Sequence, residues 1–554
     1  MKITDTSDLW WKTAVVYCLD VETYMDWDGD GRGDIEGLTH RLDHLADLGV
    51  TCLWLMPFYP TPGRDDGYDV ADFLDVDARL GDLGRFVELL RTAKDRGMRV
   101  IVDLVVNHTS DRHPWFRAAR SNRDSVYHDY YVWRDEKPKQ RRESVFPGEE
   151  SGVWSYDDKA ERYYLHNFYS HQPELNIANP RVRDEIARIM GFWVQLGVSG
   201  FRVDAVPFFL EDAADDPAGD PHEHLRDLRR FLQRRASDAV LLGEVNLPYA
   251  QQLDYFGGGD DPTQLTMQFD FVGMQALYLS LARHDAAPLT EALRARPRLP
   301  NELQWANFVR NHDELTLDKL SEEERQEVFD AFGPEPEMQV YGRGIVRRLP
   351  TMLEGDPRRI RMVYSLLFSL PGTPVLFYGE EIGMGENLEL EGRRAVRTPM
   401  QWSSEPNGGF SSATRSRLVS APPEGGYAPE HVNVVQQRHD PGSLLAFMKL
   451  LTTRYRTSSE IGWGELEILE HGNPAVFAHS VTADTGRMIA LHNFAPEATT
   501  VTVTVAGEPE DAVLADLLRE ATTPLGPRGR VEVELEPYGH RWLRVLRPGD
   551  HRLS

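Results

Sequence analysis

The sequence predicts an α/β fold: a (β/α)8 TIM barrel with a subdomain inserted after its third strand and an antiparallel β domain at its C-terminal end. Three observations predict this fold. Short apolar runs alternate with amphipathic stretches, eight such runs occur before residue 380, and the pattern changes near residue 455. Apolar strands between amphipathic helices are typical of a parallel sheet covered on both faces.

The eight strand candidates are rich in β-branched and aromatic residues and end in polar turns. They are residues 14–19, 51–56, 99–106, 200–206, 239–245, 265–271, 305–311 and 373–379. Amphipathic stretches at 38–49 and 83–97 lie between early strands and predict helices. Eight strands is the number that a closed barrel of this type needs.

The spacing of these strands divides the 554 residues into four parts. Residues 1–108 predict the first part of the barrel, and residues 109–179, rich in Tyr, Trp, His and Arg, predict an inserted subdomain over the barrel mouth. Residues 180–454 predict the second part, with a charged excursion at 314–360. In residues 455–554, short strand-like runs separated by Gly, Pro and Asp predict the β domain.

Composition excludes several classes of partner. The formal net charge of −27 disfavours nucleic acid and anionic membranes. No apolar run approaches the roughly 20 residues that span a bilayer, and the first residues lack a secretory signal pattern. We therefore expect a cytoplasmic protein, with a homo-oligomer left open. Cys18 and Cys52 lie in apolar runs outside any metal-binding spacing, which predicts buried, reduced thiols.

Ionisable side chains follow the predicted strands at the end where barrel enzymes carry their chemistry. Asp204 ends the fourth strand, Glu244 ends the fifth, and Asp313 follows the seventh. Neighbouring strands lie about 4.8 Å apart, which permits the roughly 5–5.5 Å carboxyl separation of a retaining glycosidase. Arg202 points to the same face as Asp204 and should keep it ionised. The anionic Asp204 should in turn raise the pKa of Glu244, which suits proton donation.

Four segments resemble the signature segments of the α-amylase family of glycoside hydrolases, in the family's order. They are DLVVNH at 103–108, GFRVDAV at 200–206, GEVN at 243–246 and FVRNHDE at 308–314. With flanking similarities, the resemblance covers roughly residues 14–450. It implies that Asp204 is the nucleophile, Glu244 the general acid/base, and Asp313 the third acid, which distorts and holds the sugar.

The resemblance also implies a sugar-binding pocket around these acids. Its expected members are Asp65, Tyr68, His108, Gln172, Arg202, His312 and Arg397. In the family, an aspartate and an arginine at the positions of Asp65 and Arg397 together go with a blocked pocket, which favours short α-glucosides such as maltose and trehalose over long glucans. Several stretches, RTPMQW at 397–402 among them, resemble members that interconvert maltose and trehalose. No organic cofactor is implied.

Three hypotheses follow for the reaction. In the first, freed glucose turns within a closed pocket and attacks a covalent β-glucosyl-Asp204 intermediate, which interconverts maltose and trehalose. In the second, water is the acceptor and the protein is a hydrolytic α-glucosidase or an amylase-type enzyme. The third is a non-catalytic amylase-like scaffold, which an intact acid triad disfavours. The segment EVNLPYA at 244–250 departs from the maltose-interconverting members, so both acceptors stay open.

Alternating acids on a Gly-rich stretch, DWDGDGRGD at 26–34, suit a hard cation such as Ca²⁺. Resemblance to the calcium loop of oligo-1,6-glucosidases and their relatives implies a ligand set of Asp26, Asp28, Asp30, Asp34 and the carbonyl of Arg32. A second site between the barrel and the inserted subdomain is implied at Asn107, Glu174 and Glu211. Structural calcium is the cofactor that we expect.

Overall fold

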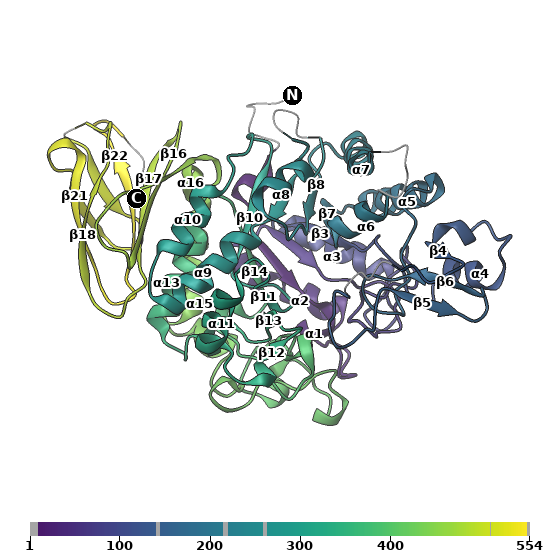
Figure 1. Ribbon diagram of the computed structural model, residues 1–554. Coiled ribbons are helices and arrows are strands. Elements are labelled where there is room, and N and C mark those ends of the chain that lie inside the picture. Colours follow the sequence, from purple (N-terminus) through teal and green to yellow (C-terminus); the bar gives the residue numbers. More distant parts are fainter. Residues whose placement is uncertain (1–8, 140–143, 214–219, 259–262, 510, 551–554) are drawn as a thin grey trace.

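Eight parallel strands close into a barrel in the order β1-β14-β10-β9-β8-β7-β3-β2 (Figure 1). The computed structural model describes residues 9–139, 144–213, 220–258, 263–509 and 511–550. The barrel strands are β1 (Val16–Leu19), β2 (Cys52–Leu55), β3 (Arg99–Leu104), β7 (Gly200–Val203), β8 (Val240–Gly243), β9 (Met267–Phe269), β10 (Gln304–Phe308) and β14 (Thr373–Phe377). Each strand lies within one of the predicted runs or extends past it by one residue, so the predicted fold class is confirmed.

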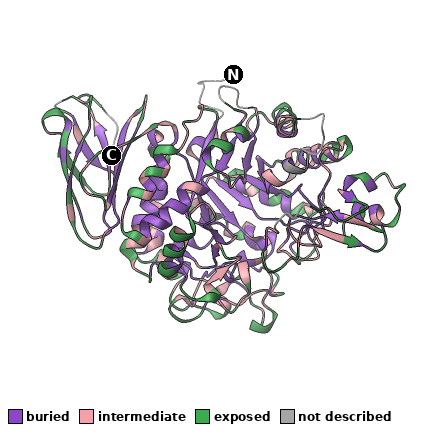
Figure 2. Ribbon diagram, in the orientation of Figure 1, coloured by how far each residue is buried: buried purple, intermediate pink, exposed green. Residues whose placement is uncertain are grey.

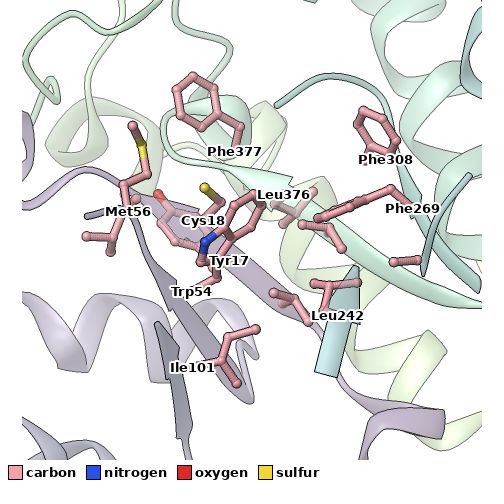
Figure 3. Packing of buried hydrophobic residues seen from close by; sticks show 14 of the residues in the cluster. Tyr17, Cys18, Trp54, Met56, Ile101, Leu242, Phe269, Phe308, Leu376 and Phe377 are labelled. Carbon is pink, nitrogen blue, oxygen red and sulfur yellow. The ribbon is translucent and has the colours of Figure 1, made fainter. Parts of the chain in front are cut away.

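Large side chains fill the inside of the barrel. Strands β1, β2, β7 and β8 are buried along their whole length. Figure 3 shows Trp54, Leu242 and Phe269, from β2, β8 and β9, packed in one cluster. Parallel strands that are buried on both faces read as continuous apolar runs, which is why the sequence revealed them. Cys18 and Cys52 are buried and free, as predicted.

Helices cover the outside of the barrel, and their inner faces are buried while their outer faces are exposed (Figure 2). The longer ones are α2 (Ile35–Leu48), α3 (Leu83–Asp95), α5 (Pro180–Leu196), α7 (His222–Arg235), α9 (Phe271–Arg283), α13 (Pro357–Ser369) and α15 (Leu444–Thr457). The shorter ones include α6 (Val206–Ala213), α8 (Tyr249–Phe256) and α10 (Ala287–Ala295). Helices α2 and α3 confirm the two predicted amphipathic stretches. In the described part of the chain, no helix has the length and apolar character to cross a membrane.

The segment between β3 and α5 forms a small subdomain beside the barrel (Figure 1). It contains helix α4 (Pro114–Ser121) and a three-stranded antiparallel sheet of β4 (Trp133–Arg134), β6 (Arg162–Leu165) and β5 (Trp154–Asp157). The sequence showed no clean helical period here, yet α4 forms. Pro114 occupies its first turn, His113 caps it by accepting from the backbone N–H of Trp115, and Trp115 and Phe116 are buried.

The excursion after β10 builds a second small sheet outside the barrel. It contains α11 (Glu322–Phe332) and a sheet of β11 (Leu315–Thr316), β13 (Gly344–Ile345) and β12 (Gln339–Val340). The excursion contacts the inserted subdomain directly, because the rings of Phe146 and Tyr341 lie 5.0 Å apart and Arg343 Nη2 donates to the carbonyl of Val145 at 2.8 Å.

The C-terminal part is the predicted antiparallel β domain. Its larger sheet has the order β15-β16-β17-β22-β19-β20, and β18 pairs with β21. These strands are β15 (Glu465–Ile468), β16 (Val476–Ala483), β17 (Gly486–Asn493), β18 (Thr499–Thr504), β19 (Val513–Asp516), β20 (Ala521–Pro524), β21 (Arg530–Leu535) and β22 (His540–Leu546). The domain has a core of its own, including Val503 and Leu514. Helix α15 crosses the predicted boundary at residue 455, and the sheet begins at Glu465.

Candidate active site

Three acids from the ends of three barrel strands line one cavity of about 460 Å³. Asp204 and Glu244 directly follow the paired strands β7 and β8, and Asp313 lies in the loop after β10. The inserted subdomain contributes Phe146 to the wall, and the excursion contributes Arg343. The structure therefore brings together the three acids that the sequence singled out, in a cavity of the size that takes a small molecule.

The guanidinium of Arg202 connects two of these acids, Asp204 and Glu244. Its Nη1 donates to Asp204 and, at 2.6 Å, to Asp103 Oδ1, while its Nη2 donates to Glu244 Oε2 at 2.6 Å. The backbone N–H of Ala205 also donates to Glu244 Oε2 at 3.2 Å. Arg202 is 1 % exposed, so these charge-assisted hydrogen bonds are shielded from water. Asp103, the first residue of the DLVVNH segment, is part of the network.

The two partners of Arg202 that line the cavity, Asp204 and Glu244, differ in pKa. Burial raises the pKa of Asp204 to about 6, and the charge of Arg202 opposes that rise. Burial also raises the pKa of Glu244 to about 7, with Arg202 opposing the rise and Asp204 adding to it. The sequence argument named only the neighbouring charges, whereas burial is the larger cause for both groups. As the pH rises, Asp204 loses its proton before Glu244 does.

Asp313, the third acid, is held by two arginines. Arg393 Nη1 lies 2.8 Å from Asp313 Oδ1, and Arg397 Nη2 donates to the same oxygen at 3.0 Å. Burial alone would raise the pKa of Asp313, but Arg393, His312 and Arg397 outweigh burial and hold that pKa well below its ordinary value. The sequence argument missed Arg393, although it lies four residues before Arg397 in the same segment.

The two predicted histidines lie against Tyr68. Tyr68 Oη and His312 Nε2 are 2.7 Å apart, and their rings are stacked within 6° of parallel. His108 Nε2 lies 3.2 Å from the carbonyl oxygen of Tyr68. Burial lowers the pKa of His108 to about 4 and that of His312 well below its ordinary value. Both rings are therefore neutral near pH 7 and act as hydrogen-bonding groups that carry no charge.

Asp65 and Arg397 have separate partners. Gln172 Nε2 donates to Asp65 Oδ2 at 2.7 Å, whereas Arg397 Nη1 donates to Asp66 Oδ2 at 2.6 Å. Burial raises the pKa of Asp65 to about 7, with Arg393 and Gln172 opposing the rise. Asp66 has a left-handed backbone, with φ 43°, so the two consecutive carboxylates diverge. Asp65 lines the cavity with the three acids, and Asp66 lies outside it.

The Gly-rich loop at 26–34 brings three of its four acids together. Ligand oxygens of Asp26, Asp28 and Asp34 lie within 4.8 Å of one another, a grouping that fits a hard cation. Asp26 also accepts from the backbone N–H groups of Gly29 and Gly31, at 2.7 and 2.8 Å.

The two other predicted ligands of this loop, Asp30 and the carbonyl of Arg32, are not part of this group of three acids. Asp30 is exposed, does not belong to the group of three, and accepts from the backbone N–H of Arg32 at 2.8 Å. The guanidinium of Arg32 pairs with Glu22. Asp26, Asp28 and Asp34 are therefore the acids of this loop whose oxygens lie close enough together to share one cation.

For the expected second metal site, the structure describes the side chains of Asn107 and Glu174 but not that of Glu211. Asn107 and Glu174 are buried between the barrel and the inserted subdomain, where His108 and Glu174 form a β-bridge. Glu174 Oε1 accepts from the backbone N–H of Asn167 at 2.9 Å. Glu211 belongs to α6, and its side chain lies outside the described residues.

Two protein families match separate parts of the chain. The alpha-amylase catalytic domain matches residues 21–329 and 346–463. A family of sucrose hydrolase-like C-terminal domains matches residues 486–544, which lie in the antiparallel β domain. The first match covers most of the chain and includes every residue that lines the acid-bearing cavity except Arg343.

Individual relatives agree with the family match. Trehalose synthase of Thermus thermophilus is 42% identical over 491 residues, 88% of this chain and 50% of that protein, so the chain spans about half the length of this relative. Trehalose synthase/amylase TreS of Mycolicibacterium smegmatis is 41% identical over 485 residues, 86% of this chain and 81% of that protein. The crystal structure of a trehalulose synthase mutant with Tris superposes with a TM-score of 0.77 at 25% identity, over 97% of this chain and 100% of that one. The chain belongs to the α-amylase family, and the acids after β7, β8 and β10 lie in its catalytic domain.

Proposed function

We propose that this protein interconverts maltose and trehalose by retaining glucosyl transfer through Asp204. The observation that carries the proposal is the bridge from Arg202 to both Asp204 and Glu244, which presents two acids of different pKa to one cavity. A pair of carboxyl groups that flank the scissile glycosidic bond, one ionised and one protonated, is what retaining glycosyl transfer requires. Relatives that are named trehalose synthases support the choice of substrate.

The reaction has two displacements. Ionised Asp204 attacks the anomeric carbon of the glucosyl unit while Glu244 gives its proton to the oxygen of the departing glucose, and the glycosidic bond breaks. The product of this step is a β-glucosyl ester on Asp204. The released glucose then turns and attacks the same carbon through another hydroxyl, whose proton passes to Glu244. The ester bond breaks, and Asp204 and Glu244 return to their starting states.

The charges around the cavity fit these steps. Arg202 holds Asp204 and Glu244 in place, and its positive charge favours the ionised form of Asp204. Asp313 is kept anionic by Arg393 and Arg397, so it can accept hydrogen bonds from sugar hydroxyls and oppose the positive charge that develops on the ring. Neutral His108 and His312 supply further hydrogen bonds.

Contacts that join the inserted subdomain to the excursion favour glucose over water as the acceptor. Phe146 of the inserted subdomain packs on Tyr341 of the excursion, and the guanidinium of Arg393 lies 4.9 Å from the centre of the Phe146 ring. Arg343 adds a hydrogen bond from the excursion to the carbonyl of Val145. If these contacts hold while the glucosyl ester exists, they keep the freed glucose in the cavity and exclude water from it.

Hydrolysis is the second candidate, because the Mycolicibacterium smegmatis relative is named both a synthase and an amylase. Incubation with maltose, and separately with trehalose, followed by NMR, distinguishes the two. The proposal predicts that each disaccharide appears from the other with little free glucose. Glucose as the sole product would support a hydrolase, and no turnover of either sugar would support the non-catalytic scaffold.

We propose further that Asp26, Asp28 and Asp34 hold a structural calcium ion. The charge of three carboxylates within a few ångströms favours a divalent cation, and oxygen ligands suit calcium. Such an ion would fix the loop that leads into α2, because Asp34 also caps that helix by accepting from the backbone N–H of Gly37.

A further inference from the structure

A second cavity, of about 410 Å³, lies behind the wall of the first. Consecutive residues of two segments face opposite ways in this wall. Asp65 and Arg393 line the cavity that holds the catalytic acids, whereas Asp66 and Arg394 line the second cavity. Arg397 lines the second cavity and donates to Asp313 in the first. The second cavity is therefore separate from the site described above and shares one ion-paired wall with it.

The lining of the second cavity is basic. Its arginines are Arg32, Arg79, Arg394, Arg397 and Arg417, and its acids are Asp20, Glu22 and Asp66. This excess of positive groups stands out in a chain whose formal net charge is −27. Arginines that line one cavity suit a phosphate group, because each guanidinium offers a planar pair of donors.

Two of these arginines, Arg394 and Arg417, have no close ion pair among the described residues. Arg394 reaches Asp66 only at 3.6 Å and is exposed over 60 % of its side chain. Arg417 has no ion pair among the described residues and is exposed at the cavity rim. By contrast, Arg79 is held by Asp77 through two hydrogen bonds of 2.8 Å. An anion can therefore bind the guanidinium groups of Arg394 and Arg417 without breaking a close ion pair.

The acids in the same lining favour a ligand that carries hydroxyl groups in addition to a phosphate. Asp20, Glu22 and Asp66 offer oxygens that accept hydrogen bonds from hydroxyl groups. The volume of about 410 Å³ lies in the range of small-molecule sites and exceeds what a single inorganic ion fills. A ligand with an anionic end and several hydroxyls matches both kinds of lining group.

The backbone at Asp66 supports a functional role for this wall. A left-handed conformation, φ 43°, costs energy in a residue other than glycine, and such conformations gather at functional sites. Here the conformation turns Asp66 towards the second cavity and Arg397. We propose that the second cavity binds a small phosphate monoester of a polyhydroxy compound, its phosphate on Arg394 and Arg417 and its hydroxyls on the carboxylates.

Isothermal titration calorimetry with the full chain tests this proposal, using glucose 6-phosphate, inorganic phosphate and glucose as probes. We expect glucose 6-phosphate to bind with a Kd of about 1 mM or tighter, phosphate to bind more weakly, and glucose to bring no heat from this site. Arg394→Gln and Arg417→Gln should each weaken binding of glucose 6-phosphate about tenfold. Arg530→Gln removes the same charge from an exposed position of β21 and should leave binding unchanged.

A second arm separates this cavity from the catalytic one. In the Asp204→Asn variant, saturating maltose should leave the affinity for glucose 6-phosphate unchanged, because the two ligands occupy different cavities. Displacement of glucose 6-phosphate by maltose would overturn the proposal, as would equal binding by the Arg417→Gln variant and the unmodified chain, or no saturable binding at all. None of these outcomes depends on turnover, so the inference and the proposed function can fail separately.

Discussion

Asp204 and Glu244, on neighbouring strands of the barrel, accept hydrogen bonds from the same guanidinium. Arg202 therefore fixes both carboxyl groups relative to each other, while burial raises the pKa of both, to about 6 for Asp204 and about 7 for Glu244. One side chain thus supports both the anionic form of the attacking group and the position of the proton donor.

The pH dependence of kcat/KM should be bell-shaped. Activity needs ionised Asp204, whose pKa is about 6, and protonated Glu244, whose pKa is about 7. The rate should fall as the pH drops below about 6, because Asp204 gains a proton, and fall again above about 7, because Glu244 loses one. Initial rates on maltose between pH 4 and 9 measure both limbs. A rate that keeps rising to pH 9 would rule out Glu244 as the acid.

Glu244→Gln should separate the two displacements. On maltose, loss of the proton donor should lower kcat by about 10³-fold. With α-glucosyl fluoride, whose leaving group needs no proton, formation of the glucosyl ester should stay fast. Asp204→Asn should lose both reactions, by about 10⁴-fold or more. Glu88→Gln, an exposed position of α3, is the matched control. Equal losses with both substrates in Glu244→Gln would contradict its role as the acid.

Weakening the contact between the excursion and the inserted subdomain should transfer more glucosyl units to water. Arg343→Gln removes a hydrogen bond to the carbonyl of Val145, so we expect a several-fold rise in the share of glucose among the products of maltose. Arg112→Gln, an exposed position of the inserted subdomain, is the control and should keep the product ratio. NMR at low conversion gives this ratio. An unchanged share of glucose in Arg343→Gln would remove this contact from the account of acceptor choice.

Removal of calcium should lower thermal stability. A bound ion stabilises the folded state by about 2.7 kcal/mol when free calcium is a hundred times its Kd, so EGTA should lower the Tm. Asp26→Asn should abolish the difference between calcium and EGTA. Asp30→Asn should preserve it, because Asp30 lies outside the group of three carboxylates. Scanning calorimetry measures all three proteins, and equal responses from the two variants would contradict the assigned ligands.

The barrel was predictable because its strands are buried on both faces and leave continuous apolar runs in the sequence. Helix α4 was not predictable in this way. It has eight residues, and its stability comes from burying Trp115 and Phe116 within the subdomain and from the cap at His113. Tertiary contacts of that kind leave no period in a single sequence.

The site was predictable where chemistry and strand position agree, as at Asp204 and Glu244. The partners of Arg397 were not predictable. Its contact with Asp66 joins residues 331 positions apart and depends on the left-handed backbone of Asp66. Burial as the main cause of the raised pKa values of Asp204 and Glu244 also needed the folded structure, because it depends on what covers the acids.

The most direct test of the central claim is to trap the covalent intermediate. The Glu244→Gln variant is mixed with 5-fluoro-α-glucosyl fluoride, whose fluorine slows both steps while its good leaving group lets the ester form. The protein is then digested and analysed by tandem mass spectrometry. We expect one fluoroglucosyl unit on the peptide that contains Asp204. The same label on another residue, or no label while the reagent is consumed, would contradict the role of Asp204 as the nucleophile.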